Sequence, residues 1–145
     1  MADNIRAVNV IASCHGHLMI DNVPIGEVTN LELTIEFEEE PVQWGMGKKR
    51  KVVGMTGSGT ITLDKVYTRF VDVFKSIQKG KDKLVDVLVT LKDPDAINGQ
   101  IETVSITGMW FKNFDIGFGD KTTKGTKEYS VGFDPTQANF IDEIK

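Results

Sequence analysis

Cysteine and histidine are scarce in this chain of 145 residues, which contains one cysteine, Cys14, and two histidines. A single cysteine excludes an internal disulfide bond, as expected of a protein that folds in a reducing cytoplasm. The sequence has no apolar run of membrane-spanning length, and its N-terminus lacks a basic start followed by an apolar stretch. We therefore expect a protein made in the cytoplasm, without a signal peptide and without stable membrane association.

Positive charge is also in short supply, because the formal net charge is -4. A general DNA-binding domain is usually basic, so this composition argues against that class. Hydrophobic residues make up 40% and charged residues 26% of the chain, which is ordinary for a globular protein. At this length we expect one domain over residues 1–145 with a single core.

Most of the chain has the pattern of β-strands. From Asn30 to Glu40 apolar and polar residues alternate, with Leu31, Leu33, Ile35 and Phe37 on one face and acidic or hydroxyl side chains on the other. This period of two is typical of a half-buried antiparallel strand. Similar strands and turn signals recur along the chain. We predict a mainly β fold, a β-sandwich or barrel of about seven to nine strands.

One amphipathic helix interrupts the strands. In LDKVYTRFVDVFKSIQKGK the apolar residues Val66, Phe70, Val73, Phe74 and Ile77 recur at helical spacing. Thr62 or Asp64 is suited to cap the start, and Lys79 and Gly80 suit the end. We expect this helix to pack outside the sheet through its apolar stripe.

The residues that usually carry chemistry form no convincing active site. Neither the phosphate-binding loop nor the dinucleotide fingerprint is present. Cys14, His15 and His17 are the only cluster of metal-ligand types; on a strand the two histidines would share one face. Two ligands without a third are a weak signal, so the sequence predicts no catalytic residue, no metal and no cofactor. An enzyme acting through this cluster remains an alternative.

The segment FEEEPVQWGMGKKRKVVG, residues 37–54, carries a block of each charge around a tryptophan. We predict an extended, hairpin-like charged loop that reaches a neighbouring subunit, in which Pro41 ends regular strand pairing and Gly45 and Gly47 allow the chain to reverse. Aromatic anchors surrounded by charged pairs are typical of protein–protein contacts. The predicted subunit-interface residues are Glu38, Glu39, Glu40, Trp44, Met46, Lys48, Lys49, Arg50 and Lys51.

In its ordered combination of HLMIDNVPIGEVTNLELTIEFEEEPV, a long charged loop, GSGTITL and one amphipathic helix, the chain resembles the contractile-phage tail tube proteins. The resemblance runs from about Asn9 to Phe133. It is strongest to the tube proteins of the phage-like element PBSX, of related clostridial phage tails and of R-type bacteriocins. It implies the β-sandwich or barrel with an outer helix that these proteins share with the type VI secretion tube.

The resemblance also implies a role in assembly. Tube proteins of this family form hexameric rings whose inner sheets join into one β-barrel, and the rings stack around a channel. The implied partners are further copies of the chain and the tail sheath, baseplate and tail-terminator proteins. DNA would pass through the lumen of a true phage without sequence-specific binding. The implied location is a virion or phage-tail-like particle assembled in the bacterial cytoplasm. The alternative is a small-molecule-binding β-barrel lined by Phe37, Trp110, Phe111 and Phe114.

Overall fold

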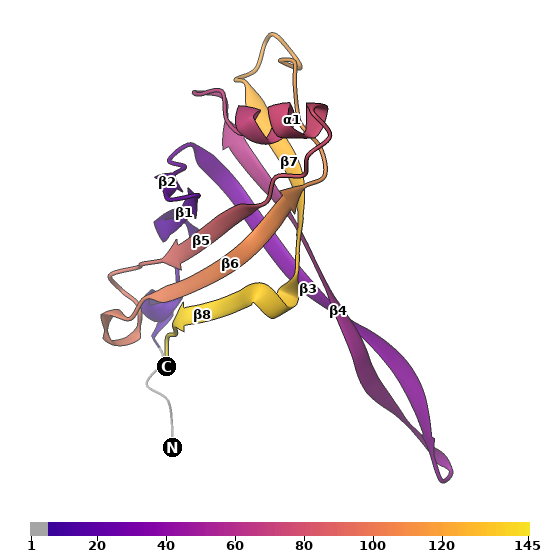
Figure 1. Ribbon diagram of the computed structural model, residues 1–145. Coiled ribbons are helices and arrows are strands. Elements are labelled where there is room, and N and C mark those ends of the chain that lie inside the picture. The colour runs from indigo at the N-terminus through magenta and orange to yellow at the C-terminus, as the bar shows by residue number, and fades with distance from the viewer. Residues whose placement is uncertain (1–5) are drawn as a thin grey trace.

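The computed structural model describes residues 6–145, which form eight strands and one α-helix (Figure 1). The helix α1 spans Val71–Gln78, and short 3-10 segments cover Ala7–Asn9, Ser13–His15, Ile97–Gly99 and Pro135–Gln137. The strands are β1 Gly16–Ile20, β2 Val23–Pro24, β3 Val28–Trp44, β4 Gly47–Asp64, β5 Val85–Leu91, β6 Glu102–Phe111, β7 Thr126–Phe133 and β8 Ala138–Asp142. No helix in this part of the chain is long and apolar enough to cross a membrane.

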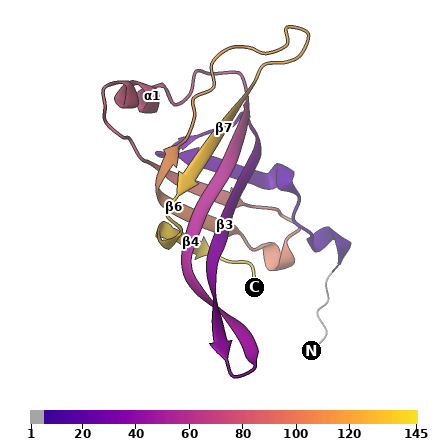
Figure 2. The same ribbon diagram turned by 90° about the vertical axis from the view of Figure 1, so that its right-hand side faces the viewer.

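The strands follow the antiparallel path β2-β1-β5-β6-β7-β4-β3, with β8 paired to β6. Strand β6 belongs to two layers, because most of it pairs with β5 and β8 whereas its end, Trp110 and Phe111, pairs with β7. Gly108, with φ +80°, lies just before this change of partner. Figure 2 shows the long strands β3, β4 and β7 crossing in front of β5 and β6. The mainly β prediction is confirmed, including the single helix.

The core lies between the two layers, where alternate side chains of each strand point inward. From β1, β5 and β6 the buried residues are Leu18, Ile20, Val85, Val87, Ile106 and Met109. From β4 and β7 they are Ile61, Leu63, Tyr129, Val131 and Phe133. Two glycines of β4 permit this close packing. A Cβ atom on Gly59 would lie 2.2 Å from the carbonyl oxygen of Glu32, and one on Gly57 would lie 2.7 Å from the Phe133 ring.

The helix is shorter than the sequence predicted. It begins after Phe70, whose φ of +62° is left-handed, so the chain turns sharply there instead of continuing a helix. Thr62 and Asp64, the predicted caps, belong to β4 and pair with β7. Val66 lies in the preceding loop and is 63% exposed. Strand pairing therefore includes the predicted caps, and the residues from 65 to 70 form an irregular loop in spite of their helical spacing.

The packing of the helix on the sheet is confirmed for the middle of the stripe. Val73 is buried, and the Phe74 and Phe114 rings stack with centroids 4.7 Å apart. Phe70 lies 4.6 Å from Phe111 and 5.1 Å from Tyr129 between ring centroids. These aromatic contacts attach α1 to β6 and β7.

Replacing Phe70 by alanine should lower the free energy of unfolding by about 3 kcal/mol, the lower end for a buried phenylalanine, because the ring is only partly buried. The loss would come from its contacts with Phe111 and Tyr129. Urea denaturation of the dilute subunit measures it. The matched control, Ile77→Ala, removes a side chain that is 46% exposed and should change stability by less than about 0.5 kcal/mol. Equal stability of both variants would show that the aromatic cluster does not secure α1.

An ion pair also fixes the segment before the helix. The Arg69 guanidinium donates to both carboxylate oxygens of Glu27, with Nε–Oε1 at 2.5 Å and Nη2–Oε2 at 3.1 Å. The Glu27 side chain is only 6% exposed. This hydrogen bonding from Arg69 lowers the pKa of Glu27, outweighing the opposing effect of burial. Because the folded carboxyl is the stronger acid, its stabilising contribution is present above the ordinary glutamate pKa and is lost as pH falls through the lowered value.

Arg69→Gln should therefore lower the free energy of unfolding by about 1–3 kcal/mol at neutral pH, since it leaves the Glu27 carboxylate without its charged partner. The deficit relative to the native chain should shrink as pH falls below about 4.3, the ordinary pKa of glutamate. Urea denaturation across this range tests the expectation, with exposed Lys81→Gln as the control. A deficit that is independent of pH would rule out the carboxylate as its source.

Candidate assembly surface

The segment predicted as a hairpin-like charged loop is a regular β-hairpin whose strands stay paired to the turn. Strands β3 and β4 pair from Val28↔Leu63 to Trp44↔Gly47, with irregularities near Thr29 and at Val53. The hairpin extends well beyond the two-layer body, on the side away from α1 (Figure 1). Every residue from 34 to 53 is exposed. We call the part formed by residues 37–54 the arm; its eight residues from Phe37 to Trp44 span roughly 26 Å at about 3.3 Å per residue.

Pro41 does not end strand pairing, contrary to the sequence prediction, because it lies opposite Arg50 within the ladder. In a two-residue hairpin, hydrogen-bonded and non-hydrogen-bonded pairs alternate from the closing pair, here Trp44↔Gly47. Pro41 falls on a non-hydrogen-bonded pair, so its missing N–H would have faced the open edge of β3. Gly45, with φ +62°, makes the reversal, whereas Gly47 already belongs to β4.

The two charge blocks are offset along the arm and meet only at their near ends. Arg50 Nη1 lies 3.1 Å from Glu39 Oε1, and Lys51 lies opposite Glu40. Both partners of the Glu39–Arg50 pair are about half exposed or more, at 47% and 63%, so the pair contributes little to stability. It does neutralise part of each block. The arm is therefore less polarised near its middle than the sequence suggests.

The end of the arm is positive and apolar. Lys48 lies opposite the uncharged Gln43, and Lys49 lies opposite Val42. Trp44 is 71% exposed, and Met46, in the turn, is fully exposed. A tryptophan and a methionine in water at the end of a projecting hairpin are costly unless another surface covers them. The structure thus places Trp44, Met46, Lys48 and Lys49 together at the arm end.

The acidic residues lie nearer the body. Glu38 is opposite Gly54 and accepts a hydrogen bond from Thr56 Oγ1 at 2.9 Å. The predicted interface residues thus divide into two sets. One set lies at the arm end. The other lies nearer the body, where some of the charges pair with each other, and consists of Glu38, Glu39, Glu40, Arg50 and Lys51.

A second apolar surface, missed by the interface prediction, lies where the arm leaves the body. Phe37 and Met55 are opposite each other and are 60% and 42% exposed. They lie on the same strand faces as Leu31 and Leu33, which pack against the core. We call Phe37, Met55 and the neighbouring Ile35 the root patch. The unbroken alternation of Leu31–Phe37 was the available sequence signal, since it continues the apolar face past the end of the body.

We call the layer formed by β3, β4 and β7 the second layer. Its face away from the core is polar. On β3 it carries Glu32, Thr34 and Glu36, which lie opposite Thr60, Ser58 and Thr56 of β4. Figure 2 views this layer from its outer side, with β3, β4 and β7 nearest the viewer. An exposed acidic and hydroxyl-rich sheet face is suited to contact with water.

The histidine cluster does not have the geometry expected of it. His15 lies in the 3-10 segment Ser13–His15 and His17 in β1, so the two do not share a strand face. His15 Nε2 is 3.9 Å from Asp93 Oδ1. Hydrogen bonds from the backbone N–H groups of Ala12 and Asp95 lower the pKa of Asp93. Within residues 6–145 no group of three potential ligands is close enough to hold a metal ion.

The aromatics of the alternative small-molecule site are also dispersed. Phe111 and Phe114 pack against the core with Tyr129, whereas Phe37 lies on the arm. Trp110 lies across from Gly132, where a Cβ atom would be 2.5 Å from the indole Nε1. These four side chains do not line one shared cavity.

Comparisons with solved structures find proteins with the same fold. Structures similar to the chain include the tube-terminating cap of the anti-feeding prophage, with a TM-score of 0.75, 12% identity and 97% of each chain covered. The sheath/tube terminator of the extracellular contractile injection system PVC, in its extended state, has a TM-score of 0.71 and 14% identity. The match covers 92% of this chain and 96% of that chain. A chain of the PVC sheath–tube complex has a TM-score of 0.66 and 14% identity, and the match covers 93% of this chain and 92% of that chain.

These structural similarities show a shared fold, and the sequence itself gives the family. A comparison with curated protein sequences gave no match. The family model described as phage tail tube protein matches residues 3–138, nearly the whole chain. The chain therefore belongs to the phage tail tube protein family.

Proposed function

We propose that the chain is a non-enzymatic structural subunit of the inner tube of a contractile phage tail or phage-tail-like particle. In this role it forms hexameric rings that stack around a central channel. The observation that carries the proposal is the exposed arm, with its apolar end and root patch, on a body of the tail tube family. A PBSX-like element or an R-type bacteriocin is the kind of particle that we propose for it.

The open edge of β3 supports ring formation. β3 ends the strand path, so the edge of a 17-residue strand is free to pair. At the other side of the second layer, β6 pairs with β7 only at Trp110 and Phe111, and residues 112–115 hydrogen-bond to Glu128 and Ser130 of β7 without forming a strand. Long exposed edges favour pairing with another chain, and closure into a barrel removes them. Copies joined edge to edge would continue this layer into the inner barrel of a ring.

The polar face of the same layer supports a channel. Its Glu32 and Glu36 carboxylates and the hydroxyls opposite them would point into the lumen when the core-facing side packs outward. A negative wall repels DNA phosphates and so reduces adhesion as DNA passes. This predicts passage without sequence-specific binding.

The arm supports stacking. Its apolar end would be buried by a subunit of the adjoining ring, and its charges would set register more than affinity, because exposed ion pairs are each worth only about 0–1 kcal/mol. Sheath, baseplate and tail-terminator proteins are the further partners of such a tube. The subunit would assemble in the host cytoplasm, become part of the particle, and need neither a cofactor nor stable membrane association.

Negative-stain electron microscopy of the purified chain over a range of concentrations tests the proposal. We expect hollow tubes of constant diameter, with six-fold symmetry in end views, and more tubes at higher concentration. In a second concentration series, baseplate components are added to nucleate tube growth. A chain that stays monomeric in both series and copurifies with a stoichiometric small molecule would contradict the proposal and favour the binding-protein alternative.

A further inference from the structure

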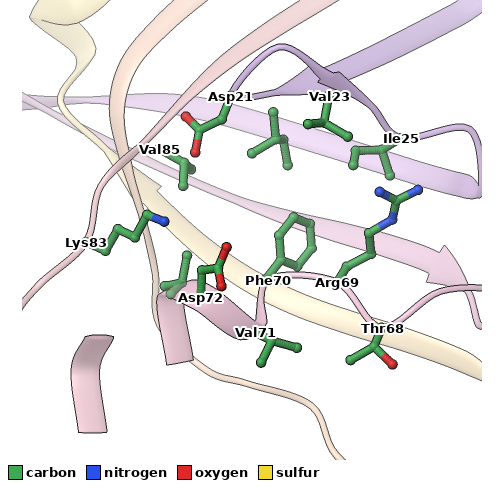
Figure 3. Close-up of a pocket in the computed structure, with 12 residues that line it drawn as sticks. Asp21, Val23, Ile25, Thr68, Arg69, Phe70, Val71, Asp72, Lys83 and Val85 are labelled. Carbon is green, nitrogen blue, oxygen red and sulfur yellow. The ribbon is translucent and has the colours of Figure 1, made fainter. Parts of the chain in front are cut away.

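A pocket of about 340 Å³ opens beside the start of α1. Its floor is apolar and consists of the buried residues Ile20, Ile25, Val73 and Val85. Figure 3 shows Val23 and Phe70 around the same space, with Asp72 and Lys83 on the side of β5. Val23 is 47% exposed on the edge strand β2, so the pocket can be entered from outside.

The rim of this pocket is more acidic than basic. Asp21 and Asp72 both line it, and among the described residues neither carboxylate takes part in an ion pair. Of the two cations there, Arg69 is already neutralised by Glu27, which leaves Lys83. Asp21 Oδ1 accepts a hydrogen bond from the backbone N–H of Asp86, which leaves its negative charge in place. An apolar floor with two carboxylates at the rim that form no ion pair fits an apolar side chain flanked by positive charge.

The arm end has this chemistry. Met46 and Trp44 are its exposed apolar groups, and Lys48 and Lys49 follow directly. The arm end cannot reach the pocket of its own copy. Strand β4 runs for 18 residues from Gly47 at the arm end to Asp64 near α1, a separation of roughly 60 Å at about 3.3 Å per residue. Only a second copy can bring the two surfaces together.

We propose that the arm end of one copy docks in the pocket beside α1 of the next copy. Met46 and Trp44 cover the apolar floor, and Lys48 and Lys49 approach Asp21 and Asp72. This inference rests on the proposed tube function and specifies which surface of the neighbour receives the arm. The contact joins two different surfaces of the same chain, so each added copy leaves one arm and one pocket free. Such heterologous contacts can continue without limit along an axis.

Thiol crosslinking of assembled protein tests the docking. In a Cys14→Ser background, Met46→Cys is combined with Val23→Cys at the pocket entrance, and tubes are treated with a short bismaleimide. We expect covalent dimers and higher multiples on a denaturing gel. Two matched controls should stay largely monomeric. One is Met46→Cys alone; the other combines it with Gln137→Cys, an exposed site outside the pocket.

The outcomes separate the docking from the tube function. Tubes in the micrographs with only monomers on the gel would overturn the docking and leave the tube function intact. Equal crosslinking in the Gln137→Cys control would overturn it too, because the reaction would not be specific to the pocket. If the native chain forms no tubes under any condition, the proposed function fails and the inference fails with it.

Discussion

Reversing Lys48, Lys49, Arg50 and Lys51 to glutamate should abolish tube formation while leaving the body of the subunit folded. The four side chains are exposed on the arm and contribute nothing to the core between the layers. Reversal makes the arm end negative and also places like charges opposite each other, since position 51 faces Glu40. Sedimentation and microscopy measure assembly, and thermal unfolding of the dilute chain should show an unchanged body.

A second variant separates the integrity of the arm from its contacts with a neighbour. Glu39→Arg and Glu40→Lys together with Arg50→Glu and Lys51→Glu exchange the charges of the Glu39–Arg50 ion pair and of the facing residues Glu40 and Lys51, and so keep opposite signs across the hairpin. It also leaves Lys48 and Lys49 in place, so this variant should still form tubes. Normal tubes from the fully reversed arm would show instead that its charges have no part in assembly.

High salt should reduce tube formation, as the charge reversal does, but to a smaller extent. At about 1 M ionic strength the Debye length is roughly 3 Å, so exposed charges on facing surfaces are largely screened. The apolar contacts of Trp44 and Met46 remain, and hydrophobic burial is not weakened by screening. We expect fewer and shorter tubes from the native chain at high salt, without complete dissociation.

The second large effect is expected at the root patch. Phe37→Glu should prevent tube formation with little change in subunit stability, because the ring is 60% exposed in the isolated chain. A large aromatic side chain presents about 150–250 Å², so covering its exposed part is worth roughly 2–4 kcal/mol per copy at about 25 cal/mol per Å². A buried, unpaired carboxylate would add a further penalty. Every copy in a tube would lose this contact.

Glu36→Gln is the matched control for this prediction. The neighbouring residue lies on the polar face of the same strand, so its substitution should leave assembly unchanged. Tubes are counted by microscopy, and urea denaturation checks the fold. Normal assembly of Phe37→Glu would show that the root patch stays in contact with water in the tube.

The fold was predictable where one kind of pattern dominated. The alternation of Leu31–Phe37 gave β3 and its core-facing side, because a period of two has no helical interpretation. The helix was harder. Residues 66–70 have helical spacing, but the end of β4 is paired with β7 and Phe70 adopts a left-handed conformation, which together exclude a helix there. Such pairing involves residues more than sixty positions away and cannot be read from a local window.

The candidate site was predictable in composition but not in geometry. The sequence identified Trp44 and Met46 and both charge blocks, yet it could not give the register that sets Glu39 against Arg50. That register follows from a two-residue turn at Gly45 and Met46, which only the paired strands reveal. The pocket beside α1 was not foreseen, because Ile20, Val73 and Val85 come from three separate elements.

The arm and one layer of the body are built from the same two strands, β3 and β4, and this has a mechanical consequence. A pull on the arm along its length travels through the backbones of β3 and β4 directly into the core. Because the hydrogen bonds that join β4 to β7 run perpendicular to the strands, such a load is shared by many of these bonds at once instead of opening them one by one. If the arm links adjoining rings, the tube gains tensile and compressive stiffness along its axis without any flexible joint. A particle driven through an envelope would use this stiffness to deliver the force of contraction at its tip.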